Sequence, residues 1–373
     1  MIKIFSTAIC IFTCATFCPA QNKQFTIIKN NPATSVKNQG RSGTCWCFST
    51  TAMTESELLL KNEPSFDLSE TFTVYNLYID KAVKYIRRRG NTRFAEGGLS
   101  QDMLNAIANY GAMPQEIYPG IGGDTIMGHN YKMAGELKNY MDSVLKANPD
   151  TIPSDWKDGF VKILNSYLGE PPATFKYNGN EYTPKSFATK FVAEKPEDFI
   201  GLTSFTHHPF YTSFVMEVPD NYNSNTYYNL PLSELIGTVE DCIMKGYTLT
   251  WDADVSNKGF RQKTGVAMWV NDKSESESFP QFKEKEYTQQ IRQELFDKQI
   301  TQDDHLMQIT GIAKDESGNK YFIVKNSWGL AGPYSGYIYV SIPYFAINTI
   351  SIVVDKKALP KKETDKIAMN NIR

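Results

Sequence analysis

The sequence predicts an α+β fold with a helical N-terminal half, an antiparallel β half towards the C-terminus and a large insertion between them. Two observations predict this class. Before Gly111, apolar side chains recur at helical spacing in three stretches. From residue 305 onwards, short runs rich in β-branched and aromatic residues alternate with turn residues such as those at 315–318.

The bulk composition is that of a globular protein. The chain has 373 residues, of which 41% are hydrophobic and 21% are charged, and its formal net charge is −2. Lysine and arginine are scattered and form no basic stripe. We therefore expect no nucleic-acid partner.

The first twenty residues predict an export signal, and with it a periplasmic or secreted protein. Lys3 precedes an apolar run that ends in small residues at Ala20. The run is too short and too rich in serine, threonine and cysteine for a membrane span. Lipid attachment at Cys14 or Cys18 is a weaker alternative, because bulky phenylalanines flank both cysteines.

The helical half is expected over residues 21–114. It starts as an extended segment and loop, and a break at Gly97 and Gly98 separates its second and third helices. The three helices are predicted at 45–60, 71–89 and 99–110.

The remaining chain divides into three expected regions. Residues 115–240 form the insertion, which is polar and of mixed pattern, residues 241–356 form the β half, and residues 357–373 form a tail. The β half should hold an amphipathic helix at 282–299 and strands at 305–313, 320–328, 336–342 and 350–355.

Cys45 has the sequence context of a nucleophile. It follows Gly40, Ser42, Gly43 and Thr44, whose backbone N–H groups can face a bound group, and it opens a predicted helix. The helix dipole favours a thiolate at that position, so we expect a lowered thiol pKa. A thiolate placed there has donors beside it for a developing oxyanion.

Cys47 is interpreted as a core residue, the usual fate of a cysteine beside tryptophan. A disulfide between Cys45 and Cys47 is improbable, since residues two apart on a helix point in different directions. A metal site would need further ligands, and only hydroxyls are near in the sequence. We expect no metal and no cofactor.

A nucleophilic cysteine needs a base, and the chain has four histidines: His129, His207, His208 and His305. His129 lies in a glycine-rich loop, where a solvated histidine is the default, whereas surface and substrate-edge roles are both open for His207 and His208 in their polar loop. His305 begins an apolar strand, and the next strand ends at Asn326. Adjacent strands would bring the imidazole beside the amide, so that the Asn carbonyl orients the ring towards the thiol.

These residues resemble the papain-like cysteine peptidases. The segment from Gln39-Gly40 to Gly43-Thr44-Cys45-Trp46-Cys47-Phe48-Ser49 is similar to their nucleophile segment, and Asn326-Ser327-Trp328-Gly329 follows the histidine in their order. The resemblance implies a papain-like fold with the active site in the cleft between its halves. It also implies thiol peptidase activity on peptide substrates.

The resemblance assigns roles to individual residues. Cys45, His305 and Asn326 would form the triad, and Gln39 would complete the oxyanion hole. The substrate backbone would bind Gly97 and Gly98, while Trp328 shields the His–Asn pair and Asp304 tunes the imidazole.

Departures from the secreted papain-like enzymes indicate one branch of the group. His305 follows Cys45 by 260 positions, whereas roughly 130 to 150 are usual. Ser42 replaces a disulfide cysteine, and residues 21–44 are too few for an inhibitory propeptide. These features, with the segments 207–221 and 251–260, resemble bleomycin hydrolase and the bacterial aminopeptidase C enzymes. That branch implies a homo-oligomer, a hexamer.

Cleavage specificity stays open at this point. In that branch a C-terminal arm lies in the cleft, and its terminal carboxylate restricts cleavage to the substrate N-terminus. The ending of this chain, 360–373, does not resemble that arm. Either the shorter tail still reaches the cleft, or an acid from 115–240 substitutes, or the cleft is open and the enzyme is an endopeptidase.

We predict a cysteine aminopeptidase, with a secreted papain-like endopeptidase as the alternative. A non-catalytic papain-fold binding protein is a third hypothesis, but such a protein should have lost at least one of Gln39, Cys45, His305 and Asn326. A different thiol enzyme, such as an amidase or a transglutaminase-like protein, usually follows its cysteine and histidine with an acid, not an asparagine.

Overall fold

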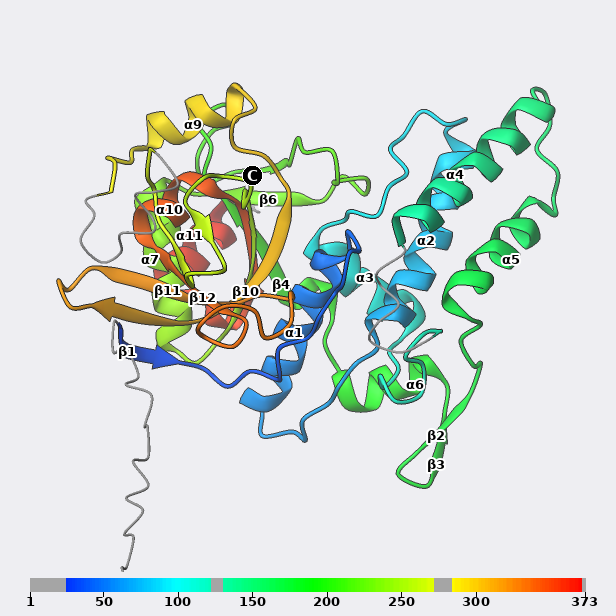
Figure 1. The fold of residues 1–373 in the computed structure, drawn as a ribbon, viewed down its shortest axis with the longest axis horizontal. Helices are drawn as coiled ribbons and strands as arrows, with labels where there is room; N and C mark the ends of the chain where they lie inside the picture. Colours follow the sequence, from blue (N-terminus) through cyan, green and yellow to red (C-terminus); the bar gives the residue numbers. More distant parts are fainter. Residues whose placement is uncertain (1–24, 122–129, 272–283, 371–373) are drawn as a thin grey trace, which may run out of the picture.

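The computed structural model describes residues 25–121, 130–271 and 284–370, which divide into a helical half and a sheet half (Figure 1). In the figure, helices α2, α4 and α5 lie on the right, the sheet lies on the left, and α1 lies between them. The α+β class predicted from the sequence is confirmed.

The helical half is built on a bundle of amphipathic helices. Helix α2 begins where the sequence supplies a cap, because the Ser69 hydroxyl accepts the N–H of Phe72 at 3.0 Å. The described elements of this half are α1 (Cys45–Leu60), α2 (Glu70–Arg87), α3 (Ser100–Tyr110), α4 (Asn130–Ala147), α5 (Trp156–Leu168), β2 (Phe175–Tyr177), β3 (Asn180–Tyr182), α6 (Pro184–Phe187), η2 (Ala188–Val192) and η3 (Pro196–Asp198).

The sheet half is one large sheet with strand order β5-β6-β4-β13-β7-β10-β11-β12-β9-β8. Most neighbouring strands are antiparallel, as expected, whereas β4–β6 and β12–β9 are parallel. Its strands are β4 (Phe199–Thr203), β5 (Ser213–Val215), β6 (Thr226–Asn229), β7 (Leu249–Ala253), β8 (Phe260–Arg261), β9 (Val266–Ala267), β10 (His305–Asp315), β11 (Lys320–Lys325), β12 (Tyr337–Ser341) and β13 (Thr349–Asp355).

Helices cover this sheet, and the N-terminal segment joins it. Strand β1 (Phe25–Asn30) pairs antiparallel with β10, so the chain is anchored on the sheet half before it crosses to α1. The helices of this half are α7 (Leu232–Met244), α9 (Gln289–Asp297), α10 (Ile342–Asn348), η4 (Lys356–Ala358) and α11 (Lys361–Asn370).

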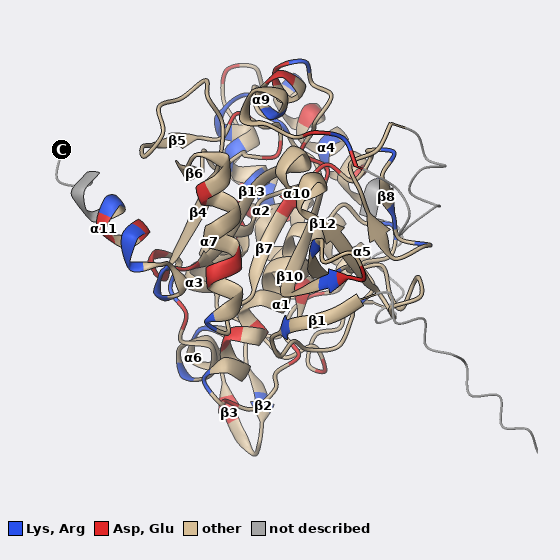
Figure 2. Ribbon diagram, turned by 90° about the vertical axis from the view of Figure 1, so that its left-hand side faces the viewer, with Lys and Arg blue, Asp and Glu red and all other residues tan. Residues whose placement is uncertain are grey.

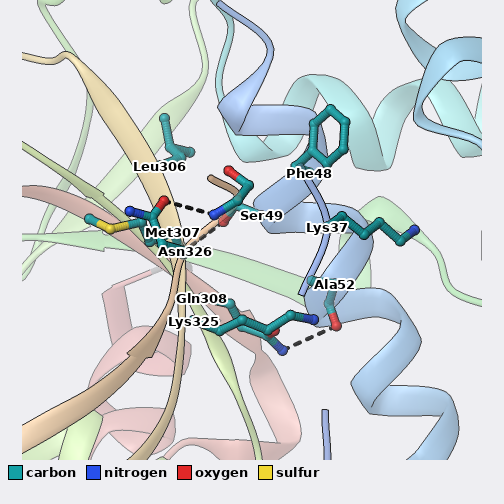
Figure 3. A pocket seen from close by; sticks show the side chains of 10 residues that line it. Lys37, Phe48, Ser49, Ala52, Leu306, Met307, Gln308, Lys325 and Asn326 are labelled. Atoms are coloured by element: carbon teal, nitrogen blue, oxygen red, sulfur yellow. Dashed lines mark hydrogen bonds between the residues drawn. The ribbon is translucent and has the colours of Figure 1, made fainter. Parts of the chain in front are cut away.

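Helix α1 is the contact between the two halves. Every residue from Cys45 to Leu58 is buried, although many are polar. Hydrogen bonds cross the interface with β10: the Ser49 hydroxyl donates to the carbonyl of Met307 at 2.7 Å, and the Gln308 amide donates to that of Ala52 at 3.1 Å (Figure 3). These bonds hold the start of α1 against the start of β10.

The predicted helices and strands agree closely with the structure outside the insertion. The region expected at 115–240 divides between the halves: α4 to η3 join the helical half, and β4 to β6 join the sheet. The helix expected at 282–299 is α9, which is shorter. The predicted export signal lies outside the described residues.

Charged residues of both signs are intermixed over the surface, without a basic face in the view of Figure 2. None of the described helices is both long and apolar enough to cross a lipid bilayer.

Candidate active site

Cys45 is the first residue of α1 and lies in the interface between the halves. Its side chain is buried, with 7% of its surface exposed, and the backbone N–H of Leu306 donates to its sulfur. The loop before it is less open than the sequence predicts, since the Gly43 N–H already donates to the Glu96 carboxylate. Cys47 is fully buried in the core, as expected.

His305 and Asn326 meet as the strand-pair argument predicts. Strands β10 and β11 are neighbours, and His305 Nε2 lies 2.8 Å from Asn326 Oδ1. Since the amide oxygen can only accept, Nε2 carries the proton and Nδ1 is left as the basic nitrogen. Asn326 is itself fixed, because its Oδ1 accepts the Ser327 N–H at 2.7 Å and its Nδ2 donates to Gln262 at 3.0 Å.

Trp328 covers this pair, with ring centroids of Trp328 and His305 4.7 Å apart. Asp304 is placed differently from its predicted role. Both of its oxygens accept backbone N–H groups, from Val255 at 2.9 Å and from Ser256 at 3.1 Å. Asp304 therefore shapes the loop after β7, next to the histidine.

Burial decides the ionisation of the two reactive groups. It raises the pKa of the Cys45 thiol to about 12 and lowers that of His305 to about 4. The lowered thiol pKa expected from the helix position is thus wrong, because desolvation by burial is the largest effect on the thiol. At these pKa values each group is neutral at pH 7.

Gln39 is held by hydrogen bonds to the loop before Cys45 and to Ser327. Its side-chain oxygen accepts the Ser327 hydroxyl at 2.6 Å, its nitrogen donates to the Ser42 carbonyl at 2.7 Å, and its backbone N–H donates to the Ser327 carbonyl at 2.9 Å. The amide nitrogen has a second hydrogen that these contacts do not use.

Replacing Gln39 with alanine is expected to lower kcat on the order of a hundredfold, because one oxyanion donor is lost. Steady-state kinetics on a peptide substrate measures this. Asn38→Ala is the matched control, since the neighbouring side chain caps Gly40 and does not contact Gln39. Equal losses in the two variants would contradict the oxyanion role.

Gly97 and Gly98 lie beside the nucleophile segment. The Trp46 indole donates to the carbonyl of Glu96 at 3.0 Å, and a Cβ at Gly98 would lie 3.2 Å from the Trp46 ring. The glycine pair is thereby packed directly against the residue that follows Cys45.

Sequence reasoning missed three residues that contact the predicted site: Ser327, Gln262 and Asp220. Ser327 lies inside the Asn-Ser-Trp-Gly motif, which is a usable signal. Gln262 and Asp220 come from distant loops, and no local pattern marks them.

Among the described residues, one group of three side chains could hold a metal ion: His207, His208 and Glu217, whose ligand atoms lie within 4.8 Å of one another. Both histidines already pair with Glu217, at 2.9 Å and 3.2 Å.

Comparison with known proteins identifies relatives of this chain. Residues 18–373 match the Peptidase C1-like family. Aminopeptidase G of Lactobacillus delbrueckii subsp. lactis is 22% identical over 90% of this chain and 84% of its own. The mitochondrial cysteine proteinase 1 of Saccharomyces cerevisiae is 22% identical over 92% and 79%. The crystal structure of pepw from Lactobacillus rhamnosis has the same fold, with a TM-score of 0.72 at 19% identity over 93% of this chain and 86% of that one.

Proposed function

The chain belongs to the Peptidase C1-like family and is a cysteine peptidase, and from this premise we propose that it is an aminopeptidase acting through Cys45, His305 and Asn326. The observation that carries the assignment of residues is the 2.8 Å contact between His305 and Asn326 at the point where β10 meets the Cys45 sulfur. Relatives named as aminopeptidases support removal of N-terminal residues.

The proposed reaction begins with both groups neutral. His305 Nδ1 takes the thiol proton while the Cys45 sulfur attacks the scissile carbonyl carbon. The resulting oxyanion is stabilised by the Gln39 amide and the Cys45 N–H. The imidazolium, held by Asn326, then protonates the leaving amine, and a thioester remains on Cys45.

Deacylation uses the same groups in reverse. A water molecule loses a proton to His305 and attacks the thioester carbonyl, and the thiolate leaves and regains the proton. The products are a free amino acid and a peptide shortened by one residue.

One experiment tests the cleavage mode directly. A long peptide is incubated with the protein in free and in N-acetylated form, and the products are identified by mass spectrometry. Stepwise loss of N-terminal residues from the free peptide alone is expected. Internal cleavage of both forms at equal rates would make the enzyme an endopeptidase.

The described tail leads away from the predicted site. Strand β13 starts beside Ala253, the residue that also pairs with His305, and ends at Asp355 six residues further along. Helix α11 then contacts α7, where Lys366 lies 2.5 Å from Glu234. In Figure 2, α11 lies at the edge of the molecule.

A truncation that ends at Leu359 is therefore expected to keep the preference for free N-termini. Rates on free and N-acetylated peptides give the result, with Lys366→Ala as the control for loss of the α7 contact alone. If the truncated protein gained activity on acetylated peptides, the tail would have to reach the cleft.

Two further parts of the proposal concern the cell and the assembly. Export rests on the pattern of residues 1–20, and detection of a mature N-terminus near Gln21 in periplasmic or secreted material would support it. A hexamer is proposed from the resemblance to the bleomycin hydrolase branch. Light scattering, which measures the molar mass in solution, tests this oligomeric state.

A further inference from the structure

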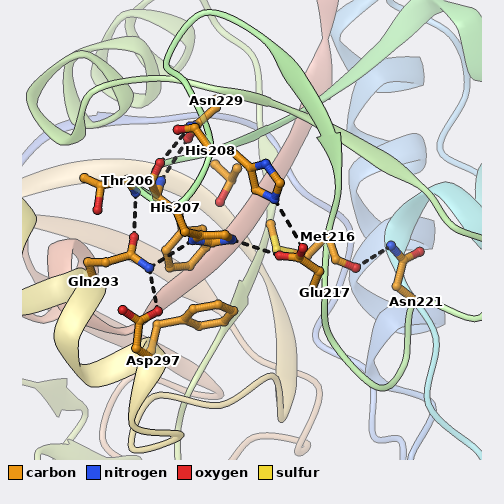
Figure 4. Close-up of polar contacts among 12 residues, drawn as sticks. Thr206, His207, His208, Met216, Glu217, Asn221, Asn229, Gln293 and Asp297 are labelled. Carbon is orange, nitrogen blue, oxygen red and sulfur yellow. Dashed lines mark hydrogen bonds and ion pairs between the residues drawn. The ribbon is translucent and has the colours of Figure 1, made fainter.

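The ten-residue loop between β5 and β6, residues 216–225, is stabilised by internal hydrogen bonds. Asn221 donates to the carbonyls of Met216 at 2.8 Å and Asn225 at 2.9 Å, and its Oδ1 accepts the Asn225 N–H at 2.7 Å. At the base of the loop, Glu217 accepts from His207 and His208 (Figure 4). The loop is therefore ordered by the sheet half to which it belongs.

The tip of the loop reaches the helical half. Asn225 donates to Asp102 of α3 at 3.0 Å, and the ammonium of Lys81 on α2 lies 4.8 Å from the Tyr222 ring. Asp220 pairs with Arg93 at 3.3 Å. The loop thus joins the two halves next to the glycine pair.

Asp220 lies directly over Gly97. A Cβ at Gly97 would be only 1.8 Å from Asp220 Oδ2 and 2.3 Å from its Cγ. Only glycine leaves room for the carboxylate here. Because Gly97 and Gly98 are the pair assigned to the substrate backbone, the carboxylate occupies the path that a longer N-terminal extension would follow.

Two further acids, Asp252 and Asp303, lie near Asp220 and form a hydrogen bond with each other, and one oxygen of each has no partner among the described residues. Asp252 is only 2% exposed, and its Oδ1 has no hydrogen-bond donor among the described residues, nor has Asp303 Oδ2. Burial and the nearby Asp220 raise the pKa of Asp303 to about 7, despite the charge of Arg93. Asp252 and Asp303 also act on the Cys45 thiol, so this acidic region adjoins the nucleophile.

Two cations oppose these acids. Arg93, which pairs with Asp220, is half exposed, and the buried ammonium of Lys81 donates to the carbonyl of Gly97 and also attracts Asp220. A cation brought by the substrate would find acceptors that the protein leaves unfilled.

We propose that Asp220 is the specificity-determining residue that binds the α-ammonium of the substrate and ends the binding groove one residue before the scissile bond. The inference rests on the proposed aminopeptidase function and names its N-terminal recognition group. In a bound substrate this ammonium and the carbonyl that Cys45 attacks belong to the same residue. A carboxylate over Gly97 is at a position that suits this short separation. A blocked or extended N-terminus would lose the ion pair and collide with the loop.

The test compares kcat/KM for an aminoacyl-aminomethylcoumarin and its N-acetylated form in the wild type and in Asp220→Asn. The variant keeps the shape of the side chain and removes its charge. The preference for the free amine should fall about tenfold or more, the loss typical of one charge-assisted hydrogen bond, mainly through KM of the free substrate. Asp241→Asn, an exposed change on α7, should leave the preference unchanged.

Folding and the proposed function are checked separately. Labelling of Cys45 by an epoxide probe and the thermal midpoint report whether Asp220→Asn is folded, and Asp220→Ser repeats the test if it is not. An unchanged preference in a folded, active variant overturns the inference and leaves the aminopeptidase intact. A wild type that cuts free and blocked substrates equally overturns both.

Discussion

Replacing Cys45 with alanine is expected to abolish peptide hydrolysis, with a loss on the order of 10⁵-fold or more, because the reaction then has no nucleophile. Labelling by an epoxide probe should disappear with it. The structure supports this selectivity: the Cys45 sulfur lies where α1 meets β10 and accepts the backbone N–H of Leu306, the residue after His305, the proposed base. Kinetics and intact-protein mass spectrometry measure both effects.

Cys47→Ala is the matched control, two positions further along the same helix. Its sulfur is fully buried and contacts the carbonyl of Glu70 at 3.7 Å, so the change should lower the thermal midpoint without abolishing hydrolysis or labelling. Equal labelling of Cys45 and Cys47 in the wild type would show that burial, not position, controls their reactivity, and the assignment would be wrong.

Much of the fold could be predicted because its signals are local. Helix α1 was expected at 45–60 and occupies those residues, and the strands that hold His305 and Asn326 were expected within a few residues of their bounds. Hydrophobic periodicity and turn residues are signals that extend over about a dozen positions. They can therefore be recognised in a single sequence. The adjacency of β10 and β11 followed from the short connection between them.

The rest depends on contacts between distant segments. Cys45 was expected to have a lowered pKa from its helix position, but its burial between the halves is a tertiary property and reverses the direction. Asp220 lies 123 positions from Gly97, and only folding of the β5–β6 loop brings the two together. The sequence offered an acid in 115–240 as one of three alternatives and could not choose the residue.

The contacts that hold the proposed catalytic residues differ from those that hold the β5–β6 loop. The loop can therefore alter substrate specificity while the reactive groups stay in place. Cys45 and His305 are fixed by bonds between α1 and β10, none of which involves the β5–β6 loop. The loop reaches the site at Gly97, against which Asp220 packs. Changes within residues 216–225 should therefore act on the choice of substrate more than on kcat.

Replacing His305 with alanine is expected to lower kcat on the order of 10⁴-fold or more, because general base and general acid are removed together. It should also slow epoxide labelling of Cys45 at pH 7, since the buried thiol, whose pKa is about 12, then has no neighbouring proton acceptor. Single-turnover kinetics and labelling rates measured against pH test the two effects. In the variant, labelling should rise with pH towards that of a free thiol.

His208→Gln is the control, because His208 lies on the same half of the protein but pairs with Glu217 at the base of the β5–β6 loop. Its imidazole stacks on Phe214, with ring centroids 4.1 Å apart, and plays no part in the proposed proton transfer. Turnover should stay close to that of the wild type, with any effect confined to KM. If His208→Gln were inactive and His305→Ala active, the base would have to come from the loop, and the assignment of His305 and Asn326 would fail together.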